Sequence, residues 1–449
     1  MGRLFGTDGA RGVANSELTP ELAMNIGRAA ASVLIDKDCD RPKVLIGKDT
    51  RMSSDMLENA LAAGLCSVGA DVLIIGVVPT PAVAYLVKEY KYDAGIMISA
   101  SHNPCEFNGI KIFQGNGFKL SDELEEQIEA IILDGVSTPP VKIGGDVGRV
   151  YYSENAKKDY IAHIVSTCKT DLKGMRVAFD CANGSSSVTA RDLFNCLGID
   201  GVYTCCEPDG VNINKECGST NLKNLKKAVL ENKCSVGIAF DGDADRMLAV
   251  DENGEEVDGD KIIAICAKAM KEKGELKSDT AVVTVMSNMG FFKFCEENGI
   301  HCEITSVGDR YVLENMLNND YNLGGEQSGH IILKDNATTG DGQLSAVKLL
   351  SVIKDSSKSL SQLAAQMKKY PQVLKNVRVT PEGKAAYETD EAIKAKISEA
   401  EEILGGDGRV LVRLSGTEPL IRVMLEGKDM DLIEKLASDI ADLVKERLS

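Results

Sequence analysis

The stretch Val44-Leu45-Ile46, followed after a helical pattern by Leu65-Cys66-Ser67-Val68-Gly69-Ala70-Asp71-Val72-Leu73-Ile74-Ile75, decides the fold. It consists of a β-branched strand, an amphipathic helix, a glycine turn and a second apolar strand. Glycine after a helix takes the left-handed conformation that ends it, and strand, helix, strand in this order gives a right-handed parallel crossover. The stretch therefore predicts an α/β unit.

The same pattern recurs in Arg176–Cys206 and in Ala281–Ser306, where Gly198 and Gly299 take the place of the first turn glycine. Internal repeats of this kind predict three related α/β/α domains with mostly parallel sheets. The alternative is that unrelated α/β segments look alike by chance.

The last part of the chain breaks the pattern and predicts a smaller α+β domain. A helix is expected near Glu391–Leu404, a hairpin over Arg409–Glu426, and a final helix after Asp431, with Glu434 completing a capping box. We place the domain boundaries at residues 1–152, 153–255, 256–370 and 371–449.

The composition limits the partners and the compartment. With a net charge of −17 over 449 residues, nucleic acid and membrane are not expected as partners, because both favour a basic surface. The 13 cysteines show no C-x-x-C pair and no Cys/His zinc spacing, which fits reduced thiols in the cytoplasm. The amino terminus lacks a signal-peptide core, and no segment approaches the ~20 apolar residues of a membrane span. We therefore expect a soluble cytoplasmic protein, either a monomer or a homodimer.

An alternating acidic segment, Asp241-Gly242-Asp243-Ala244-Asp245-Arg246, follows the apolar run Val236–Phe240. In extended backbone this alternation would turn the three carboxylates to one side, and carboxylate oxygens without His or Cys favour Mg²⁺. A solvated acidic loop is the alternative. An EF-hand loop is disfavoured because Arg246 stands where that loop needs Gly.

A hydroxyl group stands at another strand end, where Ser101 follows the apolar run Gly95–Ile98 in Ala100-Ser101-His102-Asn103-Pro104. A serine that only shapes a turn is the alternative, and the absence of G-x-S-x-G argues against a serine hydrolase. Ligands of open α/β sheets bind beyond the carboxyl ends of strands, where Ser101, Asp241 and Gly308-Asp309-Arg310 are all expected. The pattern predicts one site for phosphate chemistry on a metal, built from three loops.

Two further segments carry groups suited to a sugar phosphate. Arg413-Leu414-Ser415-Gly416-Thr417-Glu418-Pro419 with Arg422 predicts a phosphate cradle made of a glycine turn, hydroxyls and guanidinium groups, unless it is a hairpin turn with surface arginines. A hinged last domain with this cradle would close over the substrate and exclude water. Gly325-Glu326-Gln327-Ser328-Gly329-His330 offers groups for sugar hydroxyls, with His330 either a general acid/base or a structural group. Lys111 would steer a phosphate or transfer a proton, unless it is an edge-strand lysine.

Five segments, in this order, resemble the α-D-phosphohexomutase family, and most of all its bacterial branch acting on glucosamine phosphates. They are Phe5–Gly12, the Ser101 loop, the triple-aspartate loop, Gly325–His330 and Arg413–Arg422. The resemblance covers essentially the whole chain and implies that the last domain has a TATA-binding-protein-like fold. The chain departs from the family at Ala244, where close relatives often carry Gly, and at Leu414, where they often carry Pro.

The resemblance also implies a reaction and its cofactors. A phosphorylated serine would give its phosphoryl group to glucosamine 6-phosphate, and the 1,6-bisphosphate formed would turn over and return the other phosphate. Mg²⁺ would be the metal, with glucosamine 1,6-bisphosphate or glucose 1,6-bisphosphate as activator, and the product would feed UDP-N-acetylglucosamine and cell-wall precursor synthesis. The alternatives are a phosphoglucomutase or phosphomannomutase of the same family, an aspartyl phosphatase suggested by Asp241-Gly242-Asp243, and a non-catalytic sugar-phosphate sensor.

The resemblance assigns roles to individual residues. Ser101 would be the phosphoserine, and its phosphate would bind the metal together with Asp241, Asp243 and Asp245. Arg246 would lie beside that phosphate, and Arg11, Lys111 and His330 would handle phosphate or protons. The expected substrate contacts are Gly308, Asp309, Glu326, Ser328, Arg413, Ser415, Gly416, Thr417 and Arg422.

Overall fold

The computed structural model describes residues 3–6, 8–34, 41–137, 139–415 and 419–449. The chain divides by its contacts into two compact units. The first contains Met1–Met286 and Gly299–Gln366, and the second contains Ser287–Asn298 and Met367–Ser449. Each unit has its own sheets and its own hydrophobic core.

The first sheet of the first unit has the strand order β1-β2-β6-β5-β3-β4-β7. Its strands are β1 (Phe5–Gly6), β2 (Gly9–Val13), β3 (Lys43–Lys48), β4 (Asp71–Val77), β5 (Ala94–Ile98), β6 (Phe107–Gln114) and β7 (Val150–Tyr152). Strands β5, β3, β4 and β7 run parallel, whereas β1, β2 and β6 pair in antiparallel fashion. The helices that accompany them are α1 (Pro20–Leu34), α2 (Met52–Ser67), α3 (Thr80–Glu89) and α4 (Asp122–Leu133).

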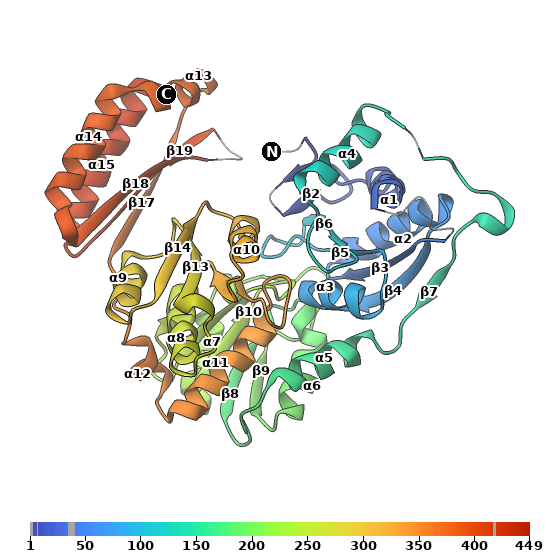
Figure 1. Cartoon of the computed structure of the whole chain (residues 1–449), viewed down its shortest axis with the longest axis horizontal. Coiled ribbons are helices and arrows are strands. Elements are labelled where there is room, and N and C mark those ends of the chain that lie inside the picture. Colours follow the sequence, from blue (N-terminus) through green and yellow to red (C-terminus); the bar gives the residue numbers. More distant parts are fainter. Residues whose placement is uncertain (1–2, 7, 35–40, 138, 416–418) are drawn as a thin grey trace. The chain divides into compact units, whose positions relative to one another are not determined.

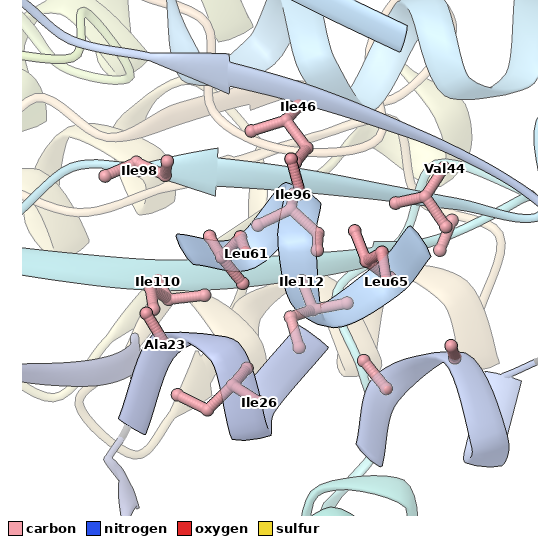
Figure 2. Close-up of a cluster of buried hydrophobic side chains, with 14 of the residues drawn as sticks. Ala23, Ile26, Val44, Ile46, Leu61, Leu65, Ile96, Ile98, Ile110 and Ile112 are labelled. Atoms are coloured by element: carbon pink, nitrogen blue, oxygen red, sulfur yellow. The ribbon is translucent and has the colours of Figure 1, made fainter. Parts of the chain in front are cut away.

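A cluster of buried aliphatic side chains joins α1 and α2 to the sheet (Figure 2). Each aliphatic side chain of this kind contributes about 1.5–3 kcal/mol when fully buried. Because β5 and β6 are fixed by this packing, so is the loop between them, which carries the candidate serine. The labelled members of the cluster are Ala23, Ile26, Val44, Ile46, Leu61, Leu65, Ile96, Ile98, Ile110 and Ile112.

Two further sheets complete the first unit, with strand orders β12-β11-β10-β8-β9 and β14-β13-β15-β16. Their strands are β8 (Arg176–Asp180), β9 (Asp200–Thr204), β10 (Val236–Phe240), β11 (Met247–Asp251), β12 (Glu256–Val257), β13 (Thr280–Thr284), β14 (His301–Thr305), β15 (Leu323–Gly325) and β16 (Ile331–Leu333). The helices of this stretch of chain are α5 (Ala156–Thr167), α6 (Ala190–Cys196), α7 (Lys223–Asn232), α8 (Gly259–Glu272), α9 (Met289–Glu297), α10 (Asp309–Asn318), α11 (Gly342–Ser356) and α12 (Leu360–Ala364). Of these helices, α9 belongs to the second unit.

The predicted crossovers are confirmed in all three repeats. Strands β3 and β4, β8 and β9, and β13 and β14 are parallel neighbours. The turn glycines Gly69, Gly198 and Gly299 have φ values of 96°, 72° and 63°, as a left-handed helix end requires. Each sheet also has antiparallel strands at one side, so the sheets are mixed. The exact domain boundaries stay a prediction.

The second unit is an α+β structure, as predicted. Strands β17 (Gln372–Arg378), β18 (Gly408–Leu414) and β19 (Leu420–Gly427) form an antiparallel sheet in the order β17-β19-β18. Helices α14 (Glu391–Leu404) and α15 (Met430–Leu448) lie side by side along this sheet (Figure 1), and a short helix, α13 (Pro381–Ala386), contacts α15.

The predicted start of the last helix is wrong by two residues. The helix begins at Met430, and the Asp429 carboxylate accepts hydrogen bonds from the backbone N–H groups of Asp431 and Leu432. Asp429 therefore satisfies the free donors of the first turn, and the capping box expected from Asp431 and Glu434 does not form.

Asp341 gives the first unit a pH-dependent contribution to stability. Its carboxylate caps α11 by accepting from the Leu344 N–H at 2.9 Å, and the Tyr160 hydroxyl of α5 donates to it at 2.9 Å. Burial raises the pKa of Asp341 from 3.8 to about 6. Because the folded state holds the proton more tightly than the unfolded chain, this contribution is complete below pH 3.8 and is lost as pH rises through about 6.

We therefore expect wild-type protein to lose up to about 3 kcal/mol of stability relative to Asp341→Asn between pH 4 and pH 8. Asparagine keeps a cap oxygen but cannot ionise. Thermal unfolding of both proteins across this range measures the difference. A gap between their midpoints that stays constant with pH would contradict the prediction.

Candidate active site

Ser101 lies in the loop that follows β5 and is fully buried. Its φ of 50° places it in the left-handed region, which is uncommon for a residue with a side chain and occurs often at functional sites. The Ser101 hydroxyl donates to Asp241 Oδ2 at 2.6 Å, and the His102 Nδ1 atom is 3.4 Å from the Ser101 Oγ. The hydroxyl therefore contacts a residue that is 140 positions away in the sequence.

The backbone around Ser101 is held by two side chains that the sequence analysis did not select. The Arg51 guanidinium donates to the carbonyl oxygens of Ser101 and Asn103 at 3.2 and 2.6 Å, and the Asn214 amide donates to the same two oxygens at 2.9 and 3.0 Å. Arg51 is itself paired with Asp49. Asp49 and Arg51 come just after β3, so they lie at the same edge of the sheet as Ser101. Their position after a parallel strand could have indicated that they belong to the site.

The three aspartates come together, although not in the way the sequence suggested. Their segment is a turn between the antiparallel strands β10 and β11, and Ala244 has a φ of 56°. The prediction of extended backbone was therefore wrong, because the chain must reverse direction here. A left-handed conformation at this position also accounts for the Gly that relatives often carry. One carboxylate oxygen from each of Asp241, Asp243 and Asp245 lies within 4.8 Å of the others.

The acidic cluster has the properties of a site for a hard cation. All three residues are at least 98% buried, and within the described parts of the chain no group hydrogen-bonds to Asp243 Oδ1 or Asp245 Oδ1. Burial, followed by the charges of the other two carboxylates, raises the pKa of Asp241 well above its usual range. Buried carboxylate oxygens with unused lone pairs are the donor set that Mg²⁺ prefers. The three aspartates could therefore hold a divalent cation.

Lys111 supplies a positive charge to this cluster. Its ammonium lies 2.8 Å from Asp243 Oδ2, 3.3 Å from Asp245 Oδ2 and 3.0 Å from Asp8 Oδ2, and its side chain is 1% exposed. Burial opposes the charge, but these carboxylates raise the pKa of Lys111 well above its usual value. The residue lies on β6, between β2 and β5, so the alternative of an edge-strand lysine is excluded.

Two arginines border the same region. The Arg246 backbone N–H donates to Asp241 Oδ1 at 3.2 Å, and its Nε lies 3.9 Å from Asp245 Oδ1. The Arg11 guanidinium is paired with Asp8, which in turn contacts Lys111. Guanidinium groups beside a cluster of carboxylates and a hydroxyl are suited to binding phosphate oxygens.

The loop after β15 joins the site through His330. The His330 ring has its Nδ1 3.8 Å from Asp245 Oδ1 and its Nε2 3.5 Å from Asp309 Oδ2, and Nε2 accepts from the Gly340 N–H at 3.1 Å. Lys119 connects Asp309 to Asp8 at 2.6 and 2.7 Å. The loops that follow β5, β10 and β14 therefore meet in one region, as the sequence analysis expected.

The predicted sugar contacts are adjacent to this region. Glu326 Oε1 accepts from the Gly308 N–H at 3.1 Å, so the two substrate-binding candidates are paired. Ser328 is exposed, which leaves its hydroxyl accessible to a ligand. The neighbouring Gln327 donates to Asp258 Oδ2 at 3.3 Å.

The predicted phosphate cradle belongs to the second unit. Arg413 of β18 and Arg422 of β19 are directly opposite each other in the antiparallel pair. Burial, and then the like charge of Arg422, lowers the pKa of Arg413. Two cations held face to face favour a bound anion, because it relieves their mutual repulsion. Lys384 donates to the Ser415 carbonyl oxygen at 2.7 Å, whereas Gly416 and Thr417 lie outside the described residues.

Four family models match successive parts of the chain. They are the phosphoglucomutase/phosphomannomutase alpha/beta/alpha domains I, II and III, at residues 2–138, 158–254 and 258–370, and the C-terminal domain of the same family, at residues 374–443. Together these models cover most of the sequence. Among the helices in the described parts of the chain, none combines the length and apolar character needed to cross a membrane.

Individual relatives and solved structures also belong to mutases of this kind by their names. The phosphoglucosamine mutase of Acetivibrio thermocellus is 55% identical over 448 residues, covering 100% of both chains. A phosphoglucomutase/phosphomannomutase family protein from Burkholderia thailandensis superposes with a TM-score of 0.83 at 22% identity, over 99% of this chain and 98% of the other. Aspergillus fumigatus N-acetylphosphoglucosamine mutase, in complex with GlcNAc-6P and magnesium, gives a TM-score of 0.72 at 18% identity, over 99% and 96% of the two chains.

The fold, the buried serine beside three aspartates and these matches define an isomerase that transfers a phosphoryl group within its substrate. The chain belongs to the phosphoglucomutase/phosphomannomutase family, the α-D-phosphohexomutases.

Proposed function

We propose that the protein interconverts glucosamine 6-phosphate and glucosamine 1-phosphate through a phosphoserine at Ser101 and a 1,6-bisphosphate intermediate. The observation that carries the proposal is the contact of the Ser101 hydroxyl with Asp241 Oδ2 at 2.6 Å, inside a buried group of three carboxylates. The substrate assignment is supported by the 55% identity over the full chain to a phosphoglucosamine mutase.

In the proposed reaction the bond between phosphorus and Ser101 Oγ breaks as phosphorus forms a bond to O1 of glucosamine 6-phosphate, and the proton of the O1 hydroxyl ends on Ser101 Oγ. In the second half the phosphoryl group on O6 passes to Ser101 Oγ, and O6 takes up a proton. Asp241, Asp243 and Asp245 would hold Mg²⁺, which supplies charge stabilisation to the transferring phosphoryl group.

The surrounding cations position the reacting phosphate. Arg246 and Arg11 would bind the oxygens of this phosphate. Lys111 would stabilise its negative charge, and this interaction is stronger in a buried site than in water. Lys111 and His330 are our candidates for proton transfer, because each lies within 4 Å of the aspartate group.

The remaining candidates would bind the rest of the substrate. Glu326, Ser328, Gly308 and Asp309 would contact sugar hydroxyls. The cradle of Arg413, Ser415, Gly416, Thr417 and Arg422 would bind the phosphate that is not reacting, in either orientation of the intermediate.

We further propose that glucosamine 1,6-bisphosphate or glucose 1,6-bisphosphate activates the enzyme by loading Ser101. The product would serve UDP-N-acetylglucosamine and cell-wall precursor synthesis in the cytoplasm, and the enzyme would be a monomer or a homodimer. The magnesium and GlcNAc-6P bound to the Aspergillus fumigatus relative support the choice of metal and of an amino-sugar phosphate.

A coupled assay with glucosamine, glucose and mannose 6-phosphates, in Mg²⁺ and bisphosphate activator, tests the proposal. We expect kcat/KM for glucosamine 6-phosphate to exceed the other two by about 10-fold or more, since pocket contacts to one substituent are worth about 1–3 kcal/mol. A preference for glucose or mannose would instead favour the phosphoglucomutase or phosphomannomutase alternative. Release of inorganic phosphate would indicate a phosphatase, and tight binding without turnover would indicate a sensor.

A further inference from the structure

A second group of potential ligands lies in the first unit, apart from the three aspartates. One oxygen of Asp180 and the sulfur atoms of Cys205 and Cys217 are all within 4.8 Å of one another. Asp180 is the last residue of β8, Cys205 directly follows β9, and Cys217 precedes a short 3-10 helix (Gly218–Thr220). The two cysteines are 12 positions apart, a spacing that does not match the sequence patterns of known zinc sites.

The carboxylate of this group has an unused acceptor. Asp180 is fully buried; its Oδ1 accepts from the Ala182 N–H at 2.9 Å, whereas none of the residues that the structure describes hydrogen-bonds to its Oδ2. A buried carboxylate oxygen without a partner costs free energy unless a proton or a cation occupies it.

The two thiols are arranged as a donor and an acceptor. The hydrogen bond between them runs from the Cys217 thiol to the Cys205 sulfur. Both cysteines are free of disulfides, Cys217 being buried and Cys205 half-buried. The Asn183 amide nitrogen lies 4.0 Å from the Cys217 sulfur and is directed at it as a donor. When both thiols give up their protons to a bound cation, this N–H group would support the Cys217 thiolate, and thiolates supported in this way are typical metal ligands.

From this geometry we propose that Asp180, Cys205 and Cys217 form a second cation site, for a thiophilic divalent cation of the Zn²⁺ class. Two sulfur ligands and one carboxylate oxygen are a set that zinc accepts, whereas Mg²⁺ takes oxygen ligands. With Zn–S bonds of about 2.3 Å, two sulfur ligands of a tetrahedral site lie about 3.8 Å apart. The two sulfur atoms are within 4.8 Å of each other, so they need to approach by about 1 Å or less to bind the same cation. Water would complete the tetrahedron.

The site has a direct connection to the Ser101 loop. Cys205 and Cys217 lie at the two ends of the segment that carries Asn214, whose amide donates to the carbonyl oxygens of Ser101 and Asn103. A cation that joins both ends of this segment to the end of β8 restricts it to the conformation in which Asn214 makes those contacts. The cation therefore stabilises the folded state by mass action and fixes the backbone beside Ser101.

The test uses the full-length protein after treatment with a chelator, in a phosphine reductant and excess Mg²⁺, with Co²⁺ as the spectroscopic probe. We expect a thiolate-to-cobalt charge-transfer band that saturates at one equivalent and disappears when Zn²⁺ is added. The three aspartates cannot produce this band because they contain no sulfur. Absence of the band in wild-type protein overturns the proposal.

Matched variants locate the ligands. Cys205→Ser should abolish the band, whereas Cys206→Ser, at the adjacent and similarly half-buried thiol, should keep it. Asp180→Asn should weaken cation binding by about 100-fold or more, since even the loss of an indirect partner costs 10–100-fold. A band that survives in Cys205→Ser refutes the assignment.

A second measurement does not depend on any variant folding correctly. In wild-type protein, Zn²⁺ should slow alkylation of Cys205 by iodoacetamide, detected by mass spectrometry, and should leave Cys206 unaffected. Equal alkylation of Cys205 with and without Zn²⁺ overturns the proposal. So does a disulfide between Cys205 and Cys217 that forms in air while the reduced protein binds no cation.

Discussion

Replacing Ser101 by alanine is expected to reduce interconversion of the 6- and 1-phosphates by about 1000-fold or more. Loss of a nucleophile removes the covalent path altogether, and such losses in other enzymes reach about 10⁶-fold. The fold should survive, because the backbone carbonyl of residue 101 keeps its hydrogen bonds from Arg51 and Asn214, although the hydroxyl contact with Asp241 is lost. The same variant should carry no acid-stable phosphate after incubation with the bisphosphate activator.

Ser345→Ala is the matched control for this variant. Ser345 is a buried serine of α11, and among the described residues its hydroxyl has no hydrogen-bond partner. Removing this hydroxyl should therefore change neither the acidic cluster nor the loop after β5. Activity of Ser345→Ala should stay within about 2-fold of wild type. Turnover of Ser101→Ala at a comparable rate would falsify the assignment of the nucleophile.

Replacing Asp243 by asparagine is expected to lower kcat by about 100-fold or more at saturating substrate and to raise the Mg²⁺ concentration needed for half-maximal activity by at least about 10-fold. The substitution is nearly isosteric, but it removes one of the charges that attract the cation and leaves Lys111, 2.8 Å from Oδ2, with one anionic neighbour fewer. An activity titration with Mg²⁺ after treatment with a chelator measures both effects.

Asp251→Asn provides the comparison for the metal effect. Asp251 is also buried and lies at the end of β11, but its carboxylate accepts from the N–H groups of Asn253 and Glu255, which an asparagine oxygen can still do. Its Mg²⁺ requirement should equal that of wild type. If Asp243→Asn retained full activity in excess chelator, the proposed role of the acidic cluster would be wrong.

The strands and their order within each repeat were predictable because buried parallel strands are continuous apolar runs. The apolar run Val236–Phe240 matches β10 residue for residue. The convergence of the three loops was also predictable, since parallel strands bring their carboxyl ends to one edge. The conformation of the aspartate segment was not, because alternation in sequence cannot distinguish a strand from a turn that gathers the same side chains.

Contacts between residues distant in sequence could not be predicted from the sequence, for a different reason. Arg51 and Asn214 reach Ser101 from 50 and 113 positions away, and neither lies in a pattern with a chemical signature of its own. The need for glycine at position 242 could not be predicted from the sequence either. A Cβ at this position would lie 2.5 Å from the Ser101 carbonyl oxygen, so glycine is needed for a close approach that only the folded chain reveals.

The double anchoring of the Ser101 carbonyl has a consequence for motion during catalysis. Its oxygen accepts hydrogen bonds from Arg51, on the loop after β3, and from Asn214, on the loop after β9, and the residue is fully buried. Because this carbonyl is held from both sides, the Ser101 backbone is fixed in position. Ser101 therefore cannot move from one end of the sugar to the other. In the proposed cycle the half-rotation must therefore be made by the small molecule, which has to detach and re-dock without escaping.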